Sequence, residues 1–314
     1  MALDPVVLFF ALGLAAGLLR SDLKISSGLY ETLSIYLLIA IGFKGGVELA
    51  AASPGSLVLP IIAVILMGAG TPLVAYPILR QLGRLSRPDS ASIAAHYGSV
   101  SVVTFAVGVS YLARLDVEYE GYMSVFLVLL EMPALAIGVL LAKGIGRDTR
   151  WGVLAHEVLA GKAVVLLVGS LLIGWYAGAE GLASLDKFYM ELFKGMLSLF
   201  LLGMGLITAA RLADVRKSGL FLIAFGILMP VVSAMGGVAV GYALGLTLGG
   251  TTLLAVLYAS ASYIAAPAAM RIAIPEANPA LSIGASLGVT FPFNVFVGIP
   301  LYYWMAGMVY GLGG

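Results

Sequence analysis

HYGSVSVVTFAVG, from His96 to Gly108, places a glycine and three hydroxyl side chains in the middle of an apolar segment. YASASYIAAPAAMR, from Tyr258 to Arg271, repeats this with two serines and then Pro267. Proline removes a helical hydrogen bond and clashes with the preceding turn. Within a membrane, irregular backbone is tolerated only beside protein or water. We therefore predict that both segments are broken helices whose related halves cross near the midplane.

The composition requires lipid as the solvent. Of the 314 residues, 61% are hydrophobic and only 11% are charged. A soluble domain is about half apolar and about one quarter charged. The net charge of +1 gives no support for nucleic-acid binding. The absence of cysteine excludes disulfides and thiolate metal sites, and with two histidines far apart we expect no metal centre and no cofactor beyond a coupling ion.

Charges and Gly/Pro clusters divide the sequence into ten apolar segments. A bilayer core of roughly 30 Å requires about 20 apolar residues as helix. We therefore predict an all-α integral membrane protein with about ten transmembrane helices. The predicted spans are Asp4–Leu19, Gly28–Phe43, Ser56–Leu79, Ser90–Leu112, Gly121–Ala142, Val153–Tyr176, Phe188–Ala210, Leu220–Leu246, Thr251–Ala273 and Pro279–Met308.

Basic residues are sorted between the two sides of the predicted membrane. Twelve lie in loops after odd-numbered spans, and only Arg114 and Lys187 lie in loops after even-numbered spans. Cytoplasmic loops carry the excess of Lys and Arg. We therefore predict a multi-pass protein of the inner (plasma) membrane with both termini outside. The twelve are Arg20, Lys24, Arg80, Arg84, Arg87, Lys143, Arg147, Arg150, Arg211, Arg216, Lys217 and Arg271.

The two halves of the chain resemble each other. LSIYLLIAIG from Leu33 corresponds to LSLFLLGMG from Leu197, and YGSVSVV from Tyr97 corresponds to YASASYI from Tyr258. ILM from Ile65 and from Ile227, and a looser match later, follow at nearly the same offset. A unit of five spans is odd, so its second copy enters the membrane from the opposite side. We predict inverted repeats over 1–143 and 153–314, joined by a short cytoplasmic linker at 144–152.

Two broken helices facing one cavity predict an anion site. Each free half-helix N-terminus offers unpaired N–H groups and a partial positive charge. The hydroxyls of Ser99, Ser101, Ser260 and Ser262 could add hydrogen bonds. The alternative is that these small residues only allow close helix packing.

Ionisable residues at mid-depth are costly and are therefore functional candidates. Glu131, just before Pro133 in the fifth span, could bind Na⁺ or carry a proton, or could hydrogen-bond backbone that the proline frees. Lys162, about nine residues into the sixth span, is a candidate for an internal ion pair. His96, three residues before Ser99, permits an intramembrane hydrolase, but no orienting carboxylate is evident in the same span, which favours a hydrogen-bonded packing histidine.

Six stretches in this order resemble a known family, the sodium-dependent bicarbonate transporters of the cyanobacterial type. The resemblance covers essentially the whole chain, and RIAIPEANPALSIGASLG is its most specific motif. The stretches are IGFKGG (Ile41–Gly46), GSVSVVTF (Gly98–Phe105), EMPAL (Glu131–Leu135), SASYIAAP (Ser260–Pro267), RIAIPEANPALSIGASLG (Arg271–Gly288) and GIPL (Gly298–Leu301).

The resemblance implies a five-plus-five inverted repeat with core and gate domains, commonly a homotrimer, that takes up bicarbonate with Na⁺. It also implies a PII-like regulatory partner on the cytoplasmic face, where the linker of this chain is shorter than in many cyanobacterial members. Carried over by position, the substrate-binding residues are Gly98, Ser99, Val100, Ser101, Ser260, Ala261 and Ser262. The cation is expected near Thr104, Glu131, Tyr263 and Asn294.

The chain departs from the family at two of these positions. Tyr263 stands where the family has an aspartate, which puts Na⁺ binding or its stoichiometry in doubt, whereas Glu131 preserves a carboxylate. The leading expectation is a secondary active transporter, not an enzyme, that couples Na⁺ to uptake of bicarbonate or a similar small anion. The alternatives are a proton- or sodium-coupled transporter of another organic anion and, from other classes, the hydrolase or a non-transporting anion sensor.

Overall fold

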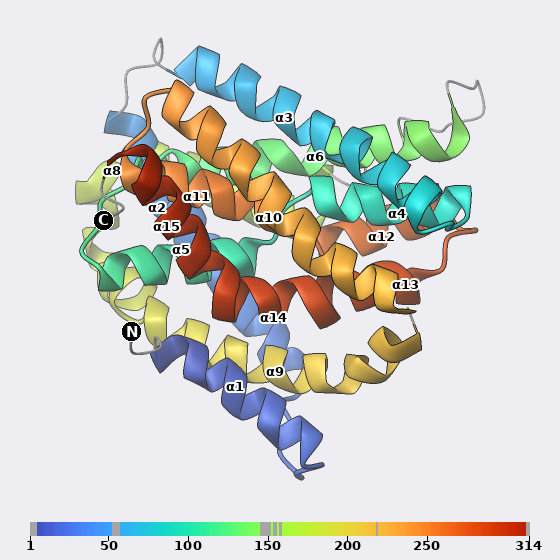
Figure 1. Cartoon of the computed structure of the whole chain (residues 1–314). Coiled ribbons are helices and arrows are strands. Elements are labelled where there is room, and N and C mark those ends of the chain that lie inside the picture. The colour runs from blue at the N-terminus through green and yellow to red at the C-terminus, as the bar shows by residue number, and fades with distance from the viewer. Residues whose placement is uncertain are drawn as a thin grey trace.

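The structure, a computed structural model, describes residues 5–51, 57–144, 152, 156, 159–217 and 219–311, and this part of the chain is helical without a strand (Figure 1). The helices of the first half are α1 (Pro5–Leu18), α2 (Ser27–Ala51), α3 (Val58–Pro77), α4 (Arg87–Gly98), α5 (Val102–Arg114) and α6 (Met123–Lys143). Those of the second half are α8 (Lys162–Leu182), α9 (Phe193–Lys217), α10 (Gly219–Ala243), α11 (Leu248–Ala259), α12 (Ala265–Ala273), α13 (Pro279–Ile283), α14 (Phe291–Phe293) and α15 (Ile299–Val309).

The predicted all-α membrane architecture is confirmed. In the described residues, eight helical segments are long and apolar enough to cross a bilayer, and the shorter apolar helices α1 and α11 match the remaining predicted spans. The two ends that differ most from the prediction are those of the second and sixth spans. The second helix continues to Ala51 because Lys44, whose Nζ donates to the hydroxyl of Tyr119 at 2.6 Å, does not terminate it. The sixth-span helix α8 begins at Lys162, nine residues later than expected, and most of the predicted linker lies outside the described residues.

The fourth and ninth spans are broken, as predicted. Helix α4 ends at Gly98 and α5 begins at Val102, with Ser99 and Ser101 in extended backbone conformations. Helix α11 ends at Ala259 and α12 begins at Ala265. Both breaks coincide with a serine-rich sequence, whose hydroxyl groups compete with the helical backbone for hydrogen bonds.

Helices α4 and α11 correspond in detail. Both have 12 residues, and α11 starts and ends 161 positions after α4, which is also the offset of the matching sequences around the breaks. Each begins with a hydroxyl cap: Ser86 accepts from the amide of Asp89, and Thr247 accepts from the amide of Gly250. These parallels agree with an internal repeat, and its inverted orientation and the core and gate domains stay predictions.

Glycines bring two further helix pairs into backbone contact. Helix α1 packs on α9 and α2 packs on α8, pairs that exchange when the halves are interchanged (Figure 1). A Cβ added to Gly13 on α1 would meet the backbone of Leu202, and one added to Gly46 on α2 would lie 2.6 Å from the amide nitrogen of Trp175. Small residues at such contacts let membrane helices pack closely.

Gly46→Ala is expected to destabilise the fold, because its methyl group must displace the backbone of α8 rather than a flexible side chain. The cost should be about 1–3 kcal/mol, as for other overpacked sites. Gly169→Ala is the matched control, since no atom lies within 4 Å of its added Cβ. Thermal unfolding in detergent should show a lower midpoint for Gly46→Ala only, and equal midpoints would contradict this packing.

Candidate anion-binding site

The two breaks are hydrogen-bonded to each other. The amide of Ser101 donates to Oγ of Ser260 at 2.9 Å, and the amide of Ser262 donates to the backbone carbonyl of His96 at 2.8 Å. The breaks are thus held together by two buried bonds between segments about 160 residues apart in sequence. Such bonds are stronger in the low dielectric of a protein interior than in water.

Two helices, α5 and α12, have their N-termini at this crossing. Oγ of Ser101 accepts from the amide of Thr104 at 3.2 Å and caps α5. Oγ of Ser262, two residues before the N-cap Ile264, accepts from the amide of Ala266 in the first turn of α12 at 3.1 Å. The first amides of each helix, such as those of Val102 and Val103, have no intrahelical acceptor, and each N-terminus carries a partial positive charge.

A cavity of about 30 Å³, the central cavity, lies against both N-termini. This is about twice the volume that a single water requires, so the cavity suits an anion of a few heavy atoms. Its walls come from the start of α5, the start of α12, and α2, α6, α8 and α9. The lining residues are Ser34, Leu37, Leu38, Val100, Ser101, Val102, Val103, Glu131, Lys162, Ala163, Phe200, Ser262, Tyr263, Ile264 and Ala265.

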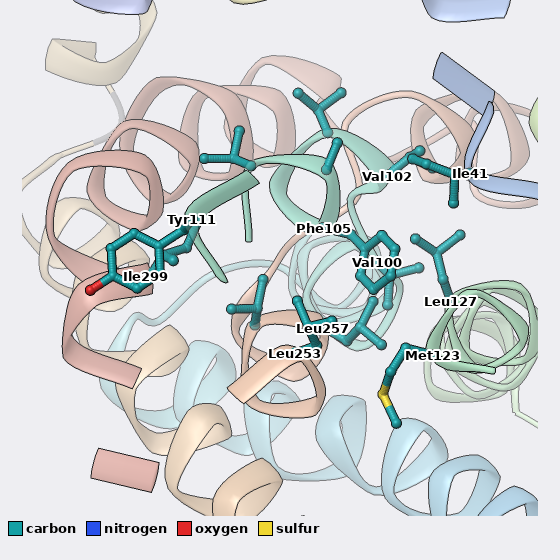
Figure 2. Close-up of a cluster of buried hydrophobic side chains, with 14 of the residues drawn as sticks. Ile41, Val100, Val102, Phe105, Tyr111, Met123, Leu127, Leu253, Leu257 and Ile299 are labelled. Atoms are coloured by element: carbon teal, nitrogen blue, oxygen red, sulfur yellow. The ribbon is translucent and has the colours of Figure 1, made fainter. Parts of the chain in front are cut away.

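Apolar side chains enclose the crossing. Val100 and Phe105, beside the break, lie close to Leu127 of α6 and to Leu253 and Leu257 of α11 (Figure 2). The span that contains α4 and α5 is the most deeply buried of those described. Hydrogen bonds and dipoles at the crossing therefore act in a water-poor environment, where they are strongest.

Glu131 places a buried carboxyl group in the wall of the central cavity. Its side chain is 2% exposed, and its Oε2 accepts a hydrogen bond from Oγ of Ser99 at 2.7 Å. No ion pair joins it to a basic side chain among the described residues. A buried carboxylate without a countercharge is costly, and a bound cation is one way to remove that cost.

Glu131 and Ser99 bring together two kinds of oxygen ligand that a sodium ion takes. A hard cation takes oxygen ligands, and here a carboxylate and the hydroxyl of Ser99 lie 2.7 Å apart, just after the C-terminal end of α4. In transporters with broken helices, such carbonyl ends hold the coupling ion while the N-terminal ends face the anion.

Tyr263 contributes a phenol to the wall of the central cavity. Its ring packs edge-on against Phe291 with centroids 5.2 Å apart. Its buried hydroxyl lies near Ser101 but outside hydrogen-bond geometry, and it has no partner among the described residues. The hydroxyl can therefore serve a ligand in the central cavity.

Five of the predicted site residues line the central cavity: Val100, Ser101, Glu131, Ser262 and Tyr263. The other six do not line it: Gly98, Ser99, Thr104, Ser260, Ala261 and Asn294.

Gly98 and Asn294 show what these supporting positions do. A Cβ added to Gly98 would lie 2.6 Å from Cδ of Pro72 and 2.8 Å from Cβ of Ala134, so glycine allows α4 to approach α3 and α6. The side-chain amide of Asn294 donates to the carbonyl of Ala259 at 2.8 Å, and its oxygen accepts from Tyr302 at 2.7 Å. The amide of Asn294 thus satisfies a carbonyl at the end of α11, and its oxygen is held by Tyr302 of α15.

The wall opposite the crossing includes residues that sequence reasoning did not assign to the site. Ser34 and Phe200 lie in the two most similar repeat segments, and that similarity was a usable signal. Lys162 forms an ion pair with Glu31 of α2, Nζ to Oε1 2.8 Å, with side chains 46% and 57% exposed. The ion pair is therefore not internal as predicted, because α8 begins at Lys162 and places it at a helix end.

The geometry gives no support to a hydrolase. Nδ1 of His96 lies 2.7 Å from the carbonyl oxygen of Ser92, and the hydroxyl of Ser99 is bonded to Glu131 instead of to the histidine. A nucleophile and its base must lie within hydrogen-bond reach.

Comparison with known proteins agrees with this arrangement. A family model described as the Na⁺-dependent bicarbonate transporter superfamily matches residues 5–307. No curated protein matches the chain. The family comprises transporters, so the prediction that the chain is not an enzyme is confirmed.

Proposed function

The chain belongs to the Na⁺-dependent bicarbonate transporter superfamily, and on this basis we propose that it takes up bicarbonate, or a similar small anion, together with Na⁺ by alternating access. The observation that carries the proposal is the convergence of two helix N-termini on one small cavity. The cavity volume supports a small inorganic anion over a larger organic one.

The anion is held by donors from both halves. The free amides at the start of α5 and α12 point their partial positive charge at the central cavity. Because Oγ of Ser101 and of Ser262 already accept backbone amides, each hydroxyl proton remains to donate to the anion. No basic side chain needs to be in contact with the anion.

Sodium is held beside the anion by Glu131 and the hydroxyl of Ser99, with nearby carbonyls completing its oxygen ligands. The ion neutralises the buried carboxylate and adds positive charge next to the anion. Each ligand therefore favours binding of the other, which is the coupling that symport requires.

A larger cavity of about 460 Å³ supports a route by which ions reach the central cavity from outside the cell. This outer vestibule lies along α2, α5 and α9, and includes Lys44 and Lys194 together with Glu191. Ile41 and Phe105 line its inner end, one turn along α2 and α5 from the central cavity, and are drawn in Figure 2. We propose that this apolar layer closes the site to the outside, while Lys162 marks its cytoplasmic end.

The finer parts of the proposal rest on the sequence. The sorting of basic residues supports both termini outside the plasma membrane. The homotrimer and the PII-like partner come from the family resemblance alone, and much of the linker that bears on such a partner lies outside the described residues.

Purified protein in proteoliposomes should take up labelled bicarbonate faster when an inward Na⁺ gradient is present than when K⁺ replaces Na⁺. A gradient supplies the driving force because binding of the two ions is coupled. Vesicles without protein control for passive CO₂ entry. Uptake equal to that of empty vesicles, with and without Na⁺, would reject the proposed function.

A further inference from the structure

A third cavity is lined by α4, by α12 and by the segment that follows α12. It has a volume of about 150 Å³ and shares no lining residue with the central cavity. We call it the rear cavity. Its lining residues are Ser92, His96, Pro267, Met270, Arg271, Ile274, Pro275, Ala277, Pro279 and Ser282.

The loop that covers the rear cavity is anchored. The amide of Asn278 donates to Oδ1 of Asp89 at 2.7 Å, which ties the loop to the first turn of α4. Oδ1 of Asn278 caps the next helix by accepting from the amide of Ala280 at 3.0 Å. This loop carries the Pro/Asn pattern of the motif Arg271–Gly288, and no residue of that motif lines the central cavity.

His96 gives the rear cavity an unused acceptor. Its Nδ1 lies 2.7 Å from the carbonyl oxygen of Ser92, and a carbonyl only accepts, so Nδ1 carries the proton. In the neutral ring Nε2 is then a bare acceptor. The side chain is 1% exposed, and Nε2 has no partner among the described residues. A buried polar atom of this kind requires an explanation.

Arg271 supplies a cation at the same cavity. It has no ion pair or hydrogen bond to another described residue. The acidic groups of the surrounding loop and helix are Asp89, whose Oδ1 is occupied by Asn278, and Glu276, which is exposed and does not line the cavity. The rear cavity therefore combines one acceptor with one positive donor.

We propose that the rear cavity binds a small oxyanion that carries a hydroxyl group. The hydroxyl donates to Nε2 of His96, and the charged oxygens accept from the guanidinium of Arg271. Bicarbonate and hydrogen phosphate share this chemistry, whereas acetate and chloride lack the donor. Only the choice of bicarbonate as the natural occupant rests on the proposed function, since transport would deliver it to this face.

The rear site is connected to the transport site through one residue. The carbonyl of His96 accepts the amide of Ser262, whose hydroxyl faces the central cavity region. A ligand that fixes the imidazole thus acts on the backbone that positions the crossing. Bicarbonate that has accumulated in the cytoplasm would in this way regulate the transporter that imported it.

Nitrogen NMR of histidine-labelled protein tests the proposal, because the chain has only two histidines and His156→Gln assigns the His96 signals. At fixed pH, bicarbonate or hydrogen phosphate should shift Nε2 of His96, and acetate and chloride should not. Arg271→Gln should raise the concentration needed by at least about tenfold, the usual effect of losing a hydrogen bond to a charged group.

Failure of this site can be separated from failure of the proposed function. The Val102→Pro variant, which removes a donor of the central cavity, should keep the bicarbonate-induced shift at His96. No shift with either hydroxylated anion, or an equal shift with acetate, would overturn the rear site. Loss of the shift in Val102→Pro would also overturn it, since the signal would then report the central cavity.

Discussion

Glu131→Gln is expected to remove the Na⁺ dependence of uptake and to lower sodium-driven transport by at least about a hundredfold, since a unit charge about 4 Å from a cation contributes about 4 kcal/mol at an effective dielectric constant near 20. Glutamine keeps the shape of the side chain, and its Oε1 can still accept from Ser99. The change therefore removes charge while preserving the packing around a 2%-exposed group.

The same substitution should leave the protein as stable as the wild type, or more stable, when Na⁺ is absent. An ionised carboxylate without a countercharge is costly to bury, and the neutral amide removes that cost. Thermal unfolding with and without Na⁺ tests this: sodium should stabilise the wild type by mass action and leave Glu131→Gln unchanged. A variant that retains sodium-stimulated uptake would show that the cation binds elsewhere.

The breaks in the fourth and ninth spans could be predicted because their cause is local. Hydroxyl side chains and glycine weaken a helix wherever they occur in sequence, and the same cluster in two matching segments indicated a shared role. The length of the apolar runs likewise fixed the ten spans, since bilayer thickness constrains each of them.

Which of the predicted residues line the central cavity and which only support it could not be predicted, because this depends on contacts with residues distant in sequence. Position alone assigned Gly98 and Asn294 to ligand binding, whereas Pro72 and Ala259 determine what those residues contact. Lys162 was placed within a span because nothing in the adjacent apolar sequence marks where α8 begins. Hydropathy indicates a segment in the membrane but not its first helical residue.

Val102→Pro removes one proposed anion donor without breaking the helix that carries it. Val102 is the first residue of α5, where proline is well tolerated and the lost N–H had no intrahelical acceptor. The preceding Ser101 has φ −112° and ψ 111°, a conformation that a following proline favours. The matching position of α12 is less suitable, because Ile264 before it has ψ −60°. Val102→Ala is the control, since it shortens the side chain and keeps the amide.

Equilibrium binding of bicarbonate to the purified variants in Na⁺ is the most direct measurement of whether the helix N-termini hold the anion. The dissociation constant of Val102→Pro should exceed that of Val102→Ala by about 10- to 100-fold, because a hydrogen bond to a charged group contributes about 1.5–3 kcal/mol. Both variants should unfold at similar temperatures. Equal affinities for bicarbonate in two folded variants would contradict an anion site built from these amides.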